Sequence, residues 1–169
     1  LPHQPRFHER HTPMALVPSL ISLFSGPGGM DEGFRQAGFR TLLAFDNDAA
    51  AVDTFKSNHP LATVKRADLS VLGEEEIVQT WRNSFPPVGL IGGPPCQSFS
   101  ISNVYQTSDD PRHRLPEHYA RILKSLNQAF AIHFFVLENV PGLVTKRHRE
   151  KFARLIALFR DAGFRVFEG

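Results

Sequence analysis

Five short apolar runs, each followed by a turn or an acidic residue, recur along this chain. They cover residues 19–24, 41–45, 63–67, 88–91 and 132–137. Runs of this length, bounded by glycine, proline or acids and separated by segments with helical spacing, are typical of buried strands. Strands that alternate with helices predict an α/β fold with a doubly wound, mostly parallel sheet.

The segments between these runs carry the spacing of amphipathic helices. We expect helices over residues 30–37, 49–57 and 74–81, a fourth with the apolar face Tyr119, Ile122, Leu123, Leu126 and Phe130, and a fifth with Phe152, Leu155, Ile156 and Phe159 that ends at Gly163. Asp31 is expected to accept hydrogen bonds at the start of the first helix, and Gly38 to follow its end. Residues 100–116 are predicted to form a loop, and residues 164–167 to begin a further strand.

A length of 169 residues suits one domain with a real core. Residues 1–18 contain four prolines and three histidines and are predicted to be a flexible arm, whereas residues 19–169 form the domain. One cysteine excludes an internal disulfide framework and fits a reducing compartment. No apolar run approaches the length of a membrane span, so we expect no membrane partner.

The net charge of +2 conceals an uneven distribution of charged residues. Residues 1–111 contain eight Lys and Arg against twelve Asp and Glu, whereas residues 112–169 contain eleven against five. A basic half of this kind favours a polyanionic partner such as nucleic acid. The alternative is an ordinary solvated helix surface.

The single cysteine, Cys96, lies in the loop that follows the apolar run 88–91. Ligands of open α/β sheets bind at the carboxyl ends of the strands. The preceding segment, Gly92-Gly93-Pro94-Pro95, combines glycines that permit close backbone approach with prolines that stiffen the loop. These features favour a nucleophile that is aimed at a substrate. The alternative is a small buried apolar residue, as most lone cysteines are.

A glycine-rich turn, Ser25-Gly26-Pro27-Gly28-Gly29, joins the first predicted strand to the first helix. Its backbone N–H groups can approach a bound ligand. Asp46, at the end of the second strand, can accept hydrogen bonds from ribose hydroxyls, and Asp68, at the end of the third, from an adenine amino group. Together they describe a site for an adenosine-containing cofactor. The alternatives are a plain turn or a dinucleotide site for the loop, and helix N-caps for the two acids.

Glu138 follows the last apolar run and therefore lies at a strand end, on the side expected for the Cys96 loop. A carboxyl group there can stabilise charge that develops on a substrate. The alternative is a loop carboxylate that caps the following helix.

Taken in order, these segments resemble the signatures of the cytosine-C5 DNA methyltransferases. The cofactor signature is matched by Leu23-Phe24-Ser25-Gly26, Gly28-Gly29, Gly33-Phe34 and Ala37-Gly38-Phe39, and the catalytic loop by residues 92–100. Asn58-His59-Pro60, Glu138-Asn139-Val140 and the pattern Asp110, Arg112, Leu115 match further segments. The resemblance covers residues 19–169. It implies the Rossmann-like fold of the S-adenosylmethionine-dependent methyltransferases, incomplete at its C-terminus.

The resemblance also implies roles for individual residues, and it implies no metal ligands. The catalytic residues would be Cys96 and Glu138. The residues that bind S-adenosylmethionine would be Phe24, Ser25, Gly26, Gly28, Gly29, Asp46, Asn47, Asp68, Leu69, Gly93 and Leu115. The residues that bind the substrate would be Pro95, Gln97, Ser100 and Asn139.

The chain departs from the family pattern in several places. Ser22 stands where an aspartate is common, Pro27 where a small or apolar residue is usual, and Asp46-Asn47 where a glutamate leads the pair. There is no Gln-x-Arg-x-Arg motif and no target-recognition region. A truncated chain, one subunit of a split enzyme and a decayed gene each explain this. The expected partners are duplex DNA and a second subunit or C-terminal region that carries target recognition.

The predicted function is transfer of a methyl group from S-adenosylmethionine to C5 of cytosine in DNA, through a covalent adduct between Cys96 and C6 of a flipped base. One alternative is a half-enzyme that binds cofactor and needs a second chain. Another is tRNA cytosine-C5 methylation. A nicotinamide-dependent dehydrogenase is disfavoured because it leaves the Cys96 loop and Glu138 without a role. The expected location is the bacterial cytoplasm, at the nucleoid, or the nucleus of a eukaryote.

Overall fold

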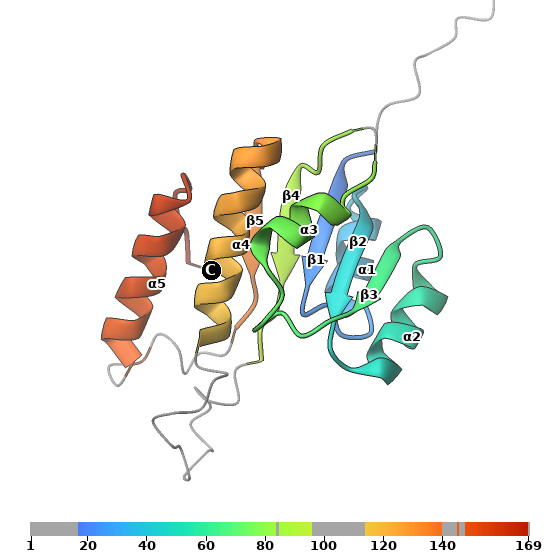
Figure 1. Ribbon diagram of the computed structural model, residues 1–169, viewed down its shortest axis with the longest axis horizontal. Coiled ribbons are helices and arrows are strands. Elements are labelled where there is room, and N and C mark those ends of the chain that lie inside the picture. Colours follow the sequence, from blue (N-terminus) through green and yellow to red (C-terminus); the bar gives the residue numbers. More distant parts are fainter. Residues whose placement is uncertain (1–16, 84, 96–113, 140–144, 146–147, 169) are drawn as a thin grey trace, which may run out of the picture.

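The computed structural model describes residues 17–83, 85–95, 114–139, 145 and 148–168. Over these residues the chain forms a five-stranded parallel sheet with helices on both faces (Figure 1). The strand order is β3-β2-β1-β4-β5, and every neighbouring pair is parallel. The predicted α/β fold with a doubly wound parallel sheet is therefore confirmed.

Strands and helices alternate along the whole described chain. The strands are β1 (Ser19–Leu23), β2 (Arg40–Asp46), β3 (Thr63–Arg66), β4 (Gly89–Gly92) and β5 (Phe134–Leu137). The helices are α1 (Gly29–Gln36), α2 (Ala49–Asn58), α3 (Glu74–Thr80), α4 (Leu115–Phe130) and α5 (Arg149–Asp161). These ten elements lie where the apolar runs and the helical spacing predict them.

The two central strands carry the core of the molecule. β1 and β4 are buried along their whole length, since helices cover both faces of a parallel sheet. Ile21, Leu90 and Ile91 are each 0% exposed. Burial of one such side chain contributes about 1.5–3 kcal/mol. The continuous apolar runs in the sequence are explained by this double-sided burial.

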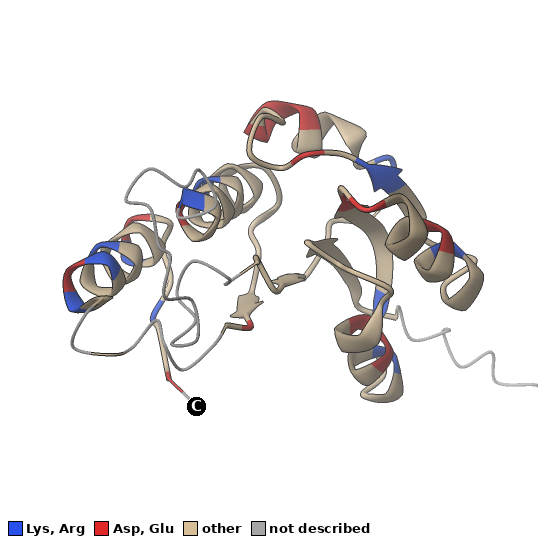
Figure 2. Cartoon of the chain, turned by 90° about the horizontal axis from the view of Figure 1, so that it is seen from below, with Lys and Arg blue, Asp and Glu red and all other residues tan. Residues whose placement is uncertain are grey.

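The helices form two layers around the sheet (Figures 1 and 2). α3 and α4 lie on one face, and α1 lies on the other. α5 packs against α4 beyond the β5 end of the sheet. All strands run in the same direction, so their carboxyl ends point toward one side, from which Figure 2 is seen.

An aromatic cluster joins α4, β5 and α5. The ring of Phe135 on β5 stacks on Phe159 of α5 at a centroid distance of 4.4 Å, and Tyr119 of α4 meets Phe159 edge-on at 6.2 Å. Phe164 contacts Phe135 edge-on at 5.4 Å. Such pairs contribute about 0.5–1.5 kcal/mol beyond their burial. The cluster therefore fixes β5 and α5 to the rest of the domain.

Two predictions about secondary structure are wrong. Residues 164–167 are not a strand, because they have no partner strand among the described residues that could complete their hydrogen bonds. The predicted loop over residues 100–116 extends too far, since α4 begins at Leu115. Pro116 lies in the first turn of α4, where a proline removes no helical hydrogen bond. Residues 1–16 of the predicted arm and residues 100–113 of the predicted loop lie outside the described residues.

None of the helices in the described part of the chain is both long and apolar enough to cross a membrane.

Candidate active site

The carboxyl ends of four neighbouring strands stand level with one another. Leu23 of β1 pairs with Phe45 of β2 on one side and with Gly92 of β4 on the other, and Gly92 in turn pairs with Leu137 of β5. The next residue on each strand therefore reaches the same edge of the sheet. Those residues are Asp46, Phe24, Gly93 and Glu138. Neighbouring strands are about 4.8 Å apart, so Asp46 and Glu138 delimit a row roughly 14 Å long.

The chain changes direction between β1 and β4. From β1 it proceeds outward through β2 to β3, and from β4 it proceeds outward through β5 on the other side. The connections on the two sides pack on opposite faces, which opens a crevice between the two central strands. Such a switch point is where open α/β sheets bind their ligands. The loops that follow β1 and β4 both lie there.

The loop after β1 has an unusual backbone. Phe24, Gly26 and Gly28 have φ values of 52°, 53° and 94°, all in the left-handed region. The Gly28 N–H donates to the Ser25 carbonyl at 3.1 Å, which closes a tight turn before α1 begins at Gly29. A phenylalanine in this region costs on the order of 1–3 kcal/mol, and such strain clusters at functional sites. The strained backbone therefore indicates a functional role for this loop beyond connecting β1 to α1.

Asp46 holds the glycine loop to β2. Its Oδ2 accepts from the Gly26 N–H at 2.7 Å, and its Oδ1 accepts from the Asp48 N–H at 2.9 Å. The N-cap of α2 is Asp48, whose side chain accepts from the Ala51 N–H at 2.7 Å. The alternative that Asp46 caps this helix is therefore wrong. Each carboxylate oxygen has a second lone pair, so Asp46 retains acceptor capacity toward a ligand.

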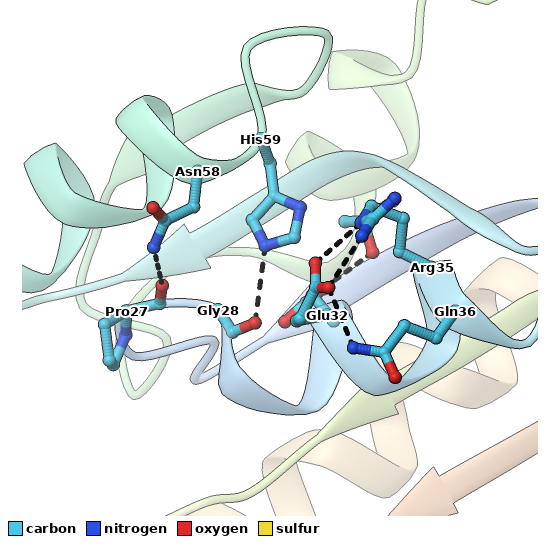
Figure 3. A network of polar contacts seen from close by, with 9 residues as sticks. Pro27, Gly28, Glu32, Arg35, Gln36, Asn58 and His59 are labelled. Carbon is cyan, nitrogen blue, oxygen red and sulfur yellow. Dashed lines mark hydrogen bonds and ion pairs between the residues drawn. The ribbon is translucent and has the colours of Figure 1, made fainter.

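Two residues at the end of α2, Asn58 and His59, point toward the loop and support it (Figure 3). The His59 Nε2 lies 3.3 Å from the Gly28 carbonyl oxygen, and the Asn58 side-chain amide donates to the Pro27 carbonyl at 3.5 Å. His59 is buried and packs on Phe55 at a ring-centroid distance of 4.5 Å. A Cβ on Gly28 would lie 2.7 Å from His59 Nε2, so this position tolerates no side chain.

Figure 3 also shows a solvent-facing network on α1, next to this support. Glu32 accepts from Arg35 at 2.6 and 2.7 Å and from the Gln36 side-chain amide at 3.0 Å. The hydrogen bonds from Arg35, followed by the one from Gln36, lower the pKa of Glu32 to about 2. Glu32 therefore remains ionised at the surface and is not available as a proton donor near neutral pH.

Asp31 anchors the first turn of α1 to the sheet. The Ser22 hydroxyl donates to Asp31 Oδ2 at 3.1 Å, and the Thr41 hydroxyl donates to Oδ1 at 2.6 Å. Asp31 is only 1% exposed, and burial raises the pKa of this carboxyl. Asp31 accepts hydrogen bonds at the start of the helix, as expected, but it is not the N-cap, which is Gly28 and has no side-chain cap hydrogen bond. The carboxylate instead joins α1 to β1 and β2.

Glu138 lies against the segment that leads to Cys96. Its N–H donates to the Gly92 carbonyl at 2.9 Å, and a Cβ built on Gly93 would lie 2.9 Å from Glu138 Oε2. The N-cap of α5 is His148, so the alternative that Glu138 caps the following helix is wrong. Cys96, Gln97 and Ser100 lie outside the described residues. Pro95, the last described residue before them, is exposed.

The buried hydroxyl of Tyr119, which the sequence did not indicate, connects β4 and β5. Tyr119 is 0% exposed, and its hydroxyl lies 2.9 Å from the Leu90 carbonyl oxygen of β4 and 3.0 Å from the Val136 carbonyl oxygen of β5. Burial raises the pKa of Tyr119 well above its ordinary value, so it stays protonated and donates. Helical spacing identified Tyr119 as core, but no sequence signal indicates where its hydroxyl points.

Comparison with known proteins identifies what this arrangement is. The family model described as C-5 cytosine-specific DNA methylase matches residues 19–168. The chain belongs to that family. The match covers nearly all of the domain, so the predicted family is confirmed. Its fold is that of the S-adenosylmethionine-dependent methyltransferases. Family membership implies S-adenosylmethionine as the cofactor.

Individual relatives of this methylase chain are similar over almost all of its length. Type II methyltransferase M.FnuDI of Fusobacterium nucleatum is 38% identical over 148 residues, which are 88% of this chain and 40% of the relative. M.NgoPII of Neisseria gonorrhoeae is 40% identical over 149 residues, which are 87% of this chain and 40% of the relative. The chain thus spans about two fifths of the length of the curated relatives it matches.

Solved structures agree with the fold of the methylase chain. A protein from E. coli, described as a prophage-encoded DNA modification methyltransferase, superposes with a TM-score of 0.72 at 34% identity, over 85% of this chain and 38% of that one. DNMT2 of Spodoptera frugiperda superposes with a TM-score of 0.60 over 84% of this chain and 41% of that one. Its identity of 23% supports the fold alone.

The remaining cofactor residues predicted for the methylase lie in two settings. Asn47 is exposed beside Asp46, and Asp68 is exposed just after the end of β3. A hydrogen bond from Ser70 lowers the pKa of Asp68. The N-cap of α3 is Gly73, so Asp68 does not cap that helix. The side chains of Leu69 and Leu115 are 2% and 6% exposed and pack in the core, and their contact with cofactor stays a prediction.

Asn139 is the predicted partner of the substrate in the methylase. It is half-buried and lines a cleft beside β5 together with residues of α5. Its backbone follows Glu138 directly, but its role toward the substrate stays a prediction.

One feature of the glycine loop bears on its fit to S-adenosylmethionine. The Ser25 hydroxyl is buried and has no hydrogen-bond partner among the described residues. A buried hydroxyl left unpaired costs about 1–3 kcal/mol, so it fits a polar ligand that completes the bond. The adjacent N-terminus of α1 favours a carboxylate such as that of the methionine part. The residues present therefore fit the cofactor.

Proposed function

We propose that this chain supplies the nucleophile, the base-contacting carboxyl group and the cofactor site for methylation of C5 of cytosine in DNA. One observation carries the proposal. The Glu138 carboxyl group lies against Gly93, three residues before Cys96 and one strand away from the strained glycine loop. The cofactor loop follows β1, the segment that leads to the proposed nucleophile follows β4, and Glu138 follows β5. These three strands are neighbours and end at the same level.

The cofactor, when bound, supplies an electrophilic methyl group. The proposed site for it is the glycine loop of residues 24–29, in which the Ser25 hydroxyl and the backbone N–H groups face the methionine part. Asp46 would accept hydrogen bonds from the ribose hydroxyls with its remaining lone pairs. Asp68 would accept from the adenine amino group. Asp31, Asn58 and His59 would keep the loop in shape without touching the ligand.

The chemical step would begin with the Cys96 thiolate. Its sulfur adds to C6 of the cytosine, and the electron pair of the C5–C6 double bond moves so that C5 becomes a nucleophile. The Glu138 carboxyl group at N3 stabilises the charge that this addition places on the ring. C5 would then take the methyl group, with the electron pair of the broken S–CH3 bond remaining on the sulfur of the departing S-adenosylhomocysteine. A base would remove the proton from C5, and the thiolate would leave as the double bond reforms.

The substrate would be duplex DNA with the target cytosine rotated out of the stack, since the face of a stacked ring cannot be reached by a thiolate. The excess of Lys and Arg in residues 112–169 suits the phosphate backbone. The relatives named above are Type II methyltransferases, and we extend DNA modification of that kind to this chain. We place it in the cytoplasm of a bacterium, at the nucleoid.

The test uses a chimera in which residues 19–168 replace the matched stretch of M.NgoPII. Labelled methyl groups from S-adenosylmethionine are offered to duplex DNA, and the labelled base is identified after digestion. We expect label on C5 of cytosine, loss of label in Cys96→Ala, and a rate lowered by about 10²–10³ in Glu138→Gln. Glu75→Gln, an exposed glutamate on α3, is the matched control and should keep the full rate.

Equal labelling by Cys96→Ala would contradict the role of the thiol. The isolated 169-residue chain is also offered tRNA, and label on tRNA in place of DNA would support the alternative of tRNA methylation. Calorimetric titration of the isolated 169-residue chain with S-adenosylmethionine completes the test. Binding without transfer by that chain, together with transfer by the chimera, would identify a half-enzyme that needs the later part of the family's polypeptide.

A further inference from the structure

Tyr119 of α4 is a buried polar side chain that takes no direct part in the proposed chemistry. It is 0% exposed, so it has no surface with which to touch cofactor or DNA. Its hydroxyl lies 2.9 Å from the Leu90 carbonyl oxygen of β4 and 3.0 Å from the Val136 carbonyl oxygen of β5. The hydroxyl has one proton, which it can donate to either carbonyl. A helical side chain thus joins two neighbouring strands.

The strands that Tyr119 joins are those that lead to the two proposed catalytic groups. β4 and β5 have only four residues each, so few ladder hydrogen bonds hold them in register. β4 ends at Gly92, and Gly93 follows it. Glycine restricts the backbone less than any other residue. The relative position of the two strand ends therefore depends on contacts besides the ladder itself.

The ring of Tyr119 supplies one such contact at the end of β4. A Cβ on Gly92 would lie 3.1 Å from Tyr119 Cε2 and would collide with the Leu23 carbonyl oxygen of β1. Gly92 therefore occupies a narrow space between β1 and the ring. The ring is packed in turn against Phe159 and Phe135, at centroid distances of 6.2 and 6.4 Å. Close packing on several sides leaves the ring little freedom to move.

The proposed reaction requires a fixed separation between the two strand ends. The thiolate adds to C6 and the carboxyl group contacts N3, and these two atoms lie opposite each other in the cytosine ring. Gly92 precedes Cys96 by four residues, and Val136 precedes Glu138 by two. The Glu138 N–H also donates to the Gly92 carbonyl at 2.9 Å. A shift of β5 relative to β4 would therefore change the separation of the two reacting groups.

We propose that Tyr119 is a positioning residue for methyl transfer, because its hydroxyl and its ring fix the separation between the ends of β4 and β5. The inference rests on the proposed function, in which Cys96 and Glu138 act on one cytosine ring. Tyr119 acts only through the strand ends, so its loss slows the reaction of bound substrate and leaves substrate binding unchanged. A misplacement of about 1 Å can lower a rate by up to about 100-fold.

Hydrogen exchange of Tyr119→Phe in the 169-residue chain tests the structural part of the inference. Two hydrogen bonds of 2.9 Å bracket the strand pair. The His133 N–H donates to the Val88 carbonyl at the amino end, and the Glu138 N–H donates to Gly92 at the carboxyl end. We expect the Glu138 amide to exchange at least about tenfold faster and the His133 amide less than about threefold faster. The same change at both amides, or none, would overturn the inference.

Kinetics of the chimera test the functional part. We expect Tyr119→Phe to lower kcat at least about tenfold and to change KM for DNA and for S-adenosylmethionine by less than about twofold. Rates are measured where both proteins are folded and are divided by the number of active sites. These are counted with duplex DNA containing 5-fluorocytosine, since fluorine on C5 cannot be removed as a proton and the Cys96 adduct persists.

A matched control separates positioning from stability. Ile77→Val removes one methyl group from a side chain of α3 that is 0% exposed, and it should lower stability to a similar extent as Tyr119→Phe. It should keep the full kcat. If Tyr119→Phe does not fold, Phe159→Leu replaces it, because it loosens the ring and keeps the hydroxyl. An unchanged kcat of the variant that is used would overturn the inference.

A double-mutant cycle identifies the group through which Tyr119 acts. In the Glu138→Gln chimera, Tyr119→Phe should lower kcat by a smaller factor than in the native chimera, because the carboxyl group to be positioned is gone. Equal factors in the two backgrounds would overturn the inference. A native chimera that neither transfers methyl groups nor forms the fluorocytosine adduct would contradict the proposed function and this inference together. An active native chimera with no effect of Tyr119→Phe would contradict this inference alone.

Discussion

Glu138 lies against Gly93 at the carboxyl edge of the sheet, where a Cβ on the glycine would come within 2.9 Å of Glu138 Oε2. The two residues leave neighbouring strands, and the Glu138 N–H is bonded to the carbonyl of Gly92. The carboxyl group can occupy this place only because position 93 has no side chain. The glycine pair before the two prolines thus positions a group on another strand.

Gly93→Ala should therefore impair activity without unfolding the protein. The methyl group would push the Glu138 carboxyl group away from the position it now occupies, so we expect methyl transfer by the chimera to fall about 10- to 100-fold. The free energy of unfolding should change by less than about 1 kcal/mol, because Glu138 is exposed and can move. Transfer is measured with labelled cofactor, and unfolding with urea.

Gly33→Ala is the control for this prediction. Gly33 lies within α1, and a Cβ there would meet no atom within 4 Å. An alanine at this helical position should stabilise the protein by roughly 0.5–1 kcal/mol and leave the rate unchanged. Full activity of Gly93→Ala would show that the position of Glu138 has no bearing on the reaction.

Gly28→Ala should weaken cofactor binding and stability together. Gly28 has a φ of 94°, and a Cβ there would lie 2.7 Å from His59 Nε2. Strain and collision should cost about 1–3 kcal/mol in unfolding free energy. The loop would lose its support, and we expect the Kd for S-adenosylmethionine, measured by calorimetry, to rise at least about tenfold. Gly33→Ala is again the control, since Gly33 lies outside the loop and a Cβ on it meets nothing within 4 Å.

The buried Asp31 predicts a pH dependence of stability. Burial raises the pKa of its carboxyl group in the folded state, and hydrogen bonds from Thr41 and Ser22 offset part of that effect. Above about pH 4 the unfolded chain loses this proton first, so the folded state binds more protons and its stability falls as pH rises through the raised pKa. Asp31→Asn has no ionisable group at this position, so its stability does not fall with pH for this reason. The stability of Asp31→Asn relative to the native chain should therefore increase from pH 4 to pH 7.

Urea unfolding at several pH values between 4 and 7 measures that difference, and Glu32→Gln is the matched control. The pKa of Glu32 is lowered to about 2, mainly by its hydrogen bonds from Arg35, so its stabilising contribution is present at neutral pH and is lost as pH falls toward that value. The two variants should thus show opposite trends. A pH-independent difference for Asp31→Asn would contradict the raised pKa.

Tyr119→Phe should destabilise the joint between β4 and β5. The hydroxyl donates a buried hydrogen bond between the Leu90 and Val136 carbonyls, and its loss leaves those carbonyls without that donor. We expect a loss of about 1–2 kcal/mol in urea unfolding. Ser57→Ala removes an exposed hydroxyl that bonds within α2, and it should cost nothing measurable. A loss no larger than that of Ser57→Ala would mean that the Tyr119 hydroxyl is dispensable.

Most of the fold could be predicted because its signals are local. Double-sided burial produces the unbroken apolar runs of β1 and β4, and amphipathic packing produces the spacing of α4 and α5. The run at residues 164–167 has the same local pattern as a strand. It is not one, because a strand also needs a neighbour to bond with, and that depends on residues far away in the sequence.

The candidate site was predicted in part, for a similar reason. Turn chemistry and the position of acids at strand ends indicated the glycine loop, Asp46 and Glu138. For Asp31 the sequence predicted hydrogen bonds at the start of a helix but not their donors, since Ser22 and Thr41 lie on two other elements and leave no local pattern. The contact between His59 and the Gly28 carbonyl joins residues thirty-one positions apart, so the local sequence does not predict it either.

The sequence by itself determined the alternation of strands and helices, the family and the types of residue that the chemistry needs. These depend on apolar period, on turn residues and on short motifs, all of which act over a few positions. The tertiary structure alone decided which strand ends stand level, which hydroxyls bind the buried carboxylate, and which strands form the two edges of the described sheet. Those properties depend on strand register and on packing between distant segments, which arise only when the sheet forms.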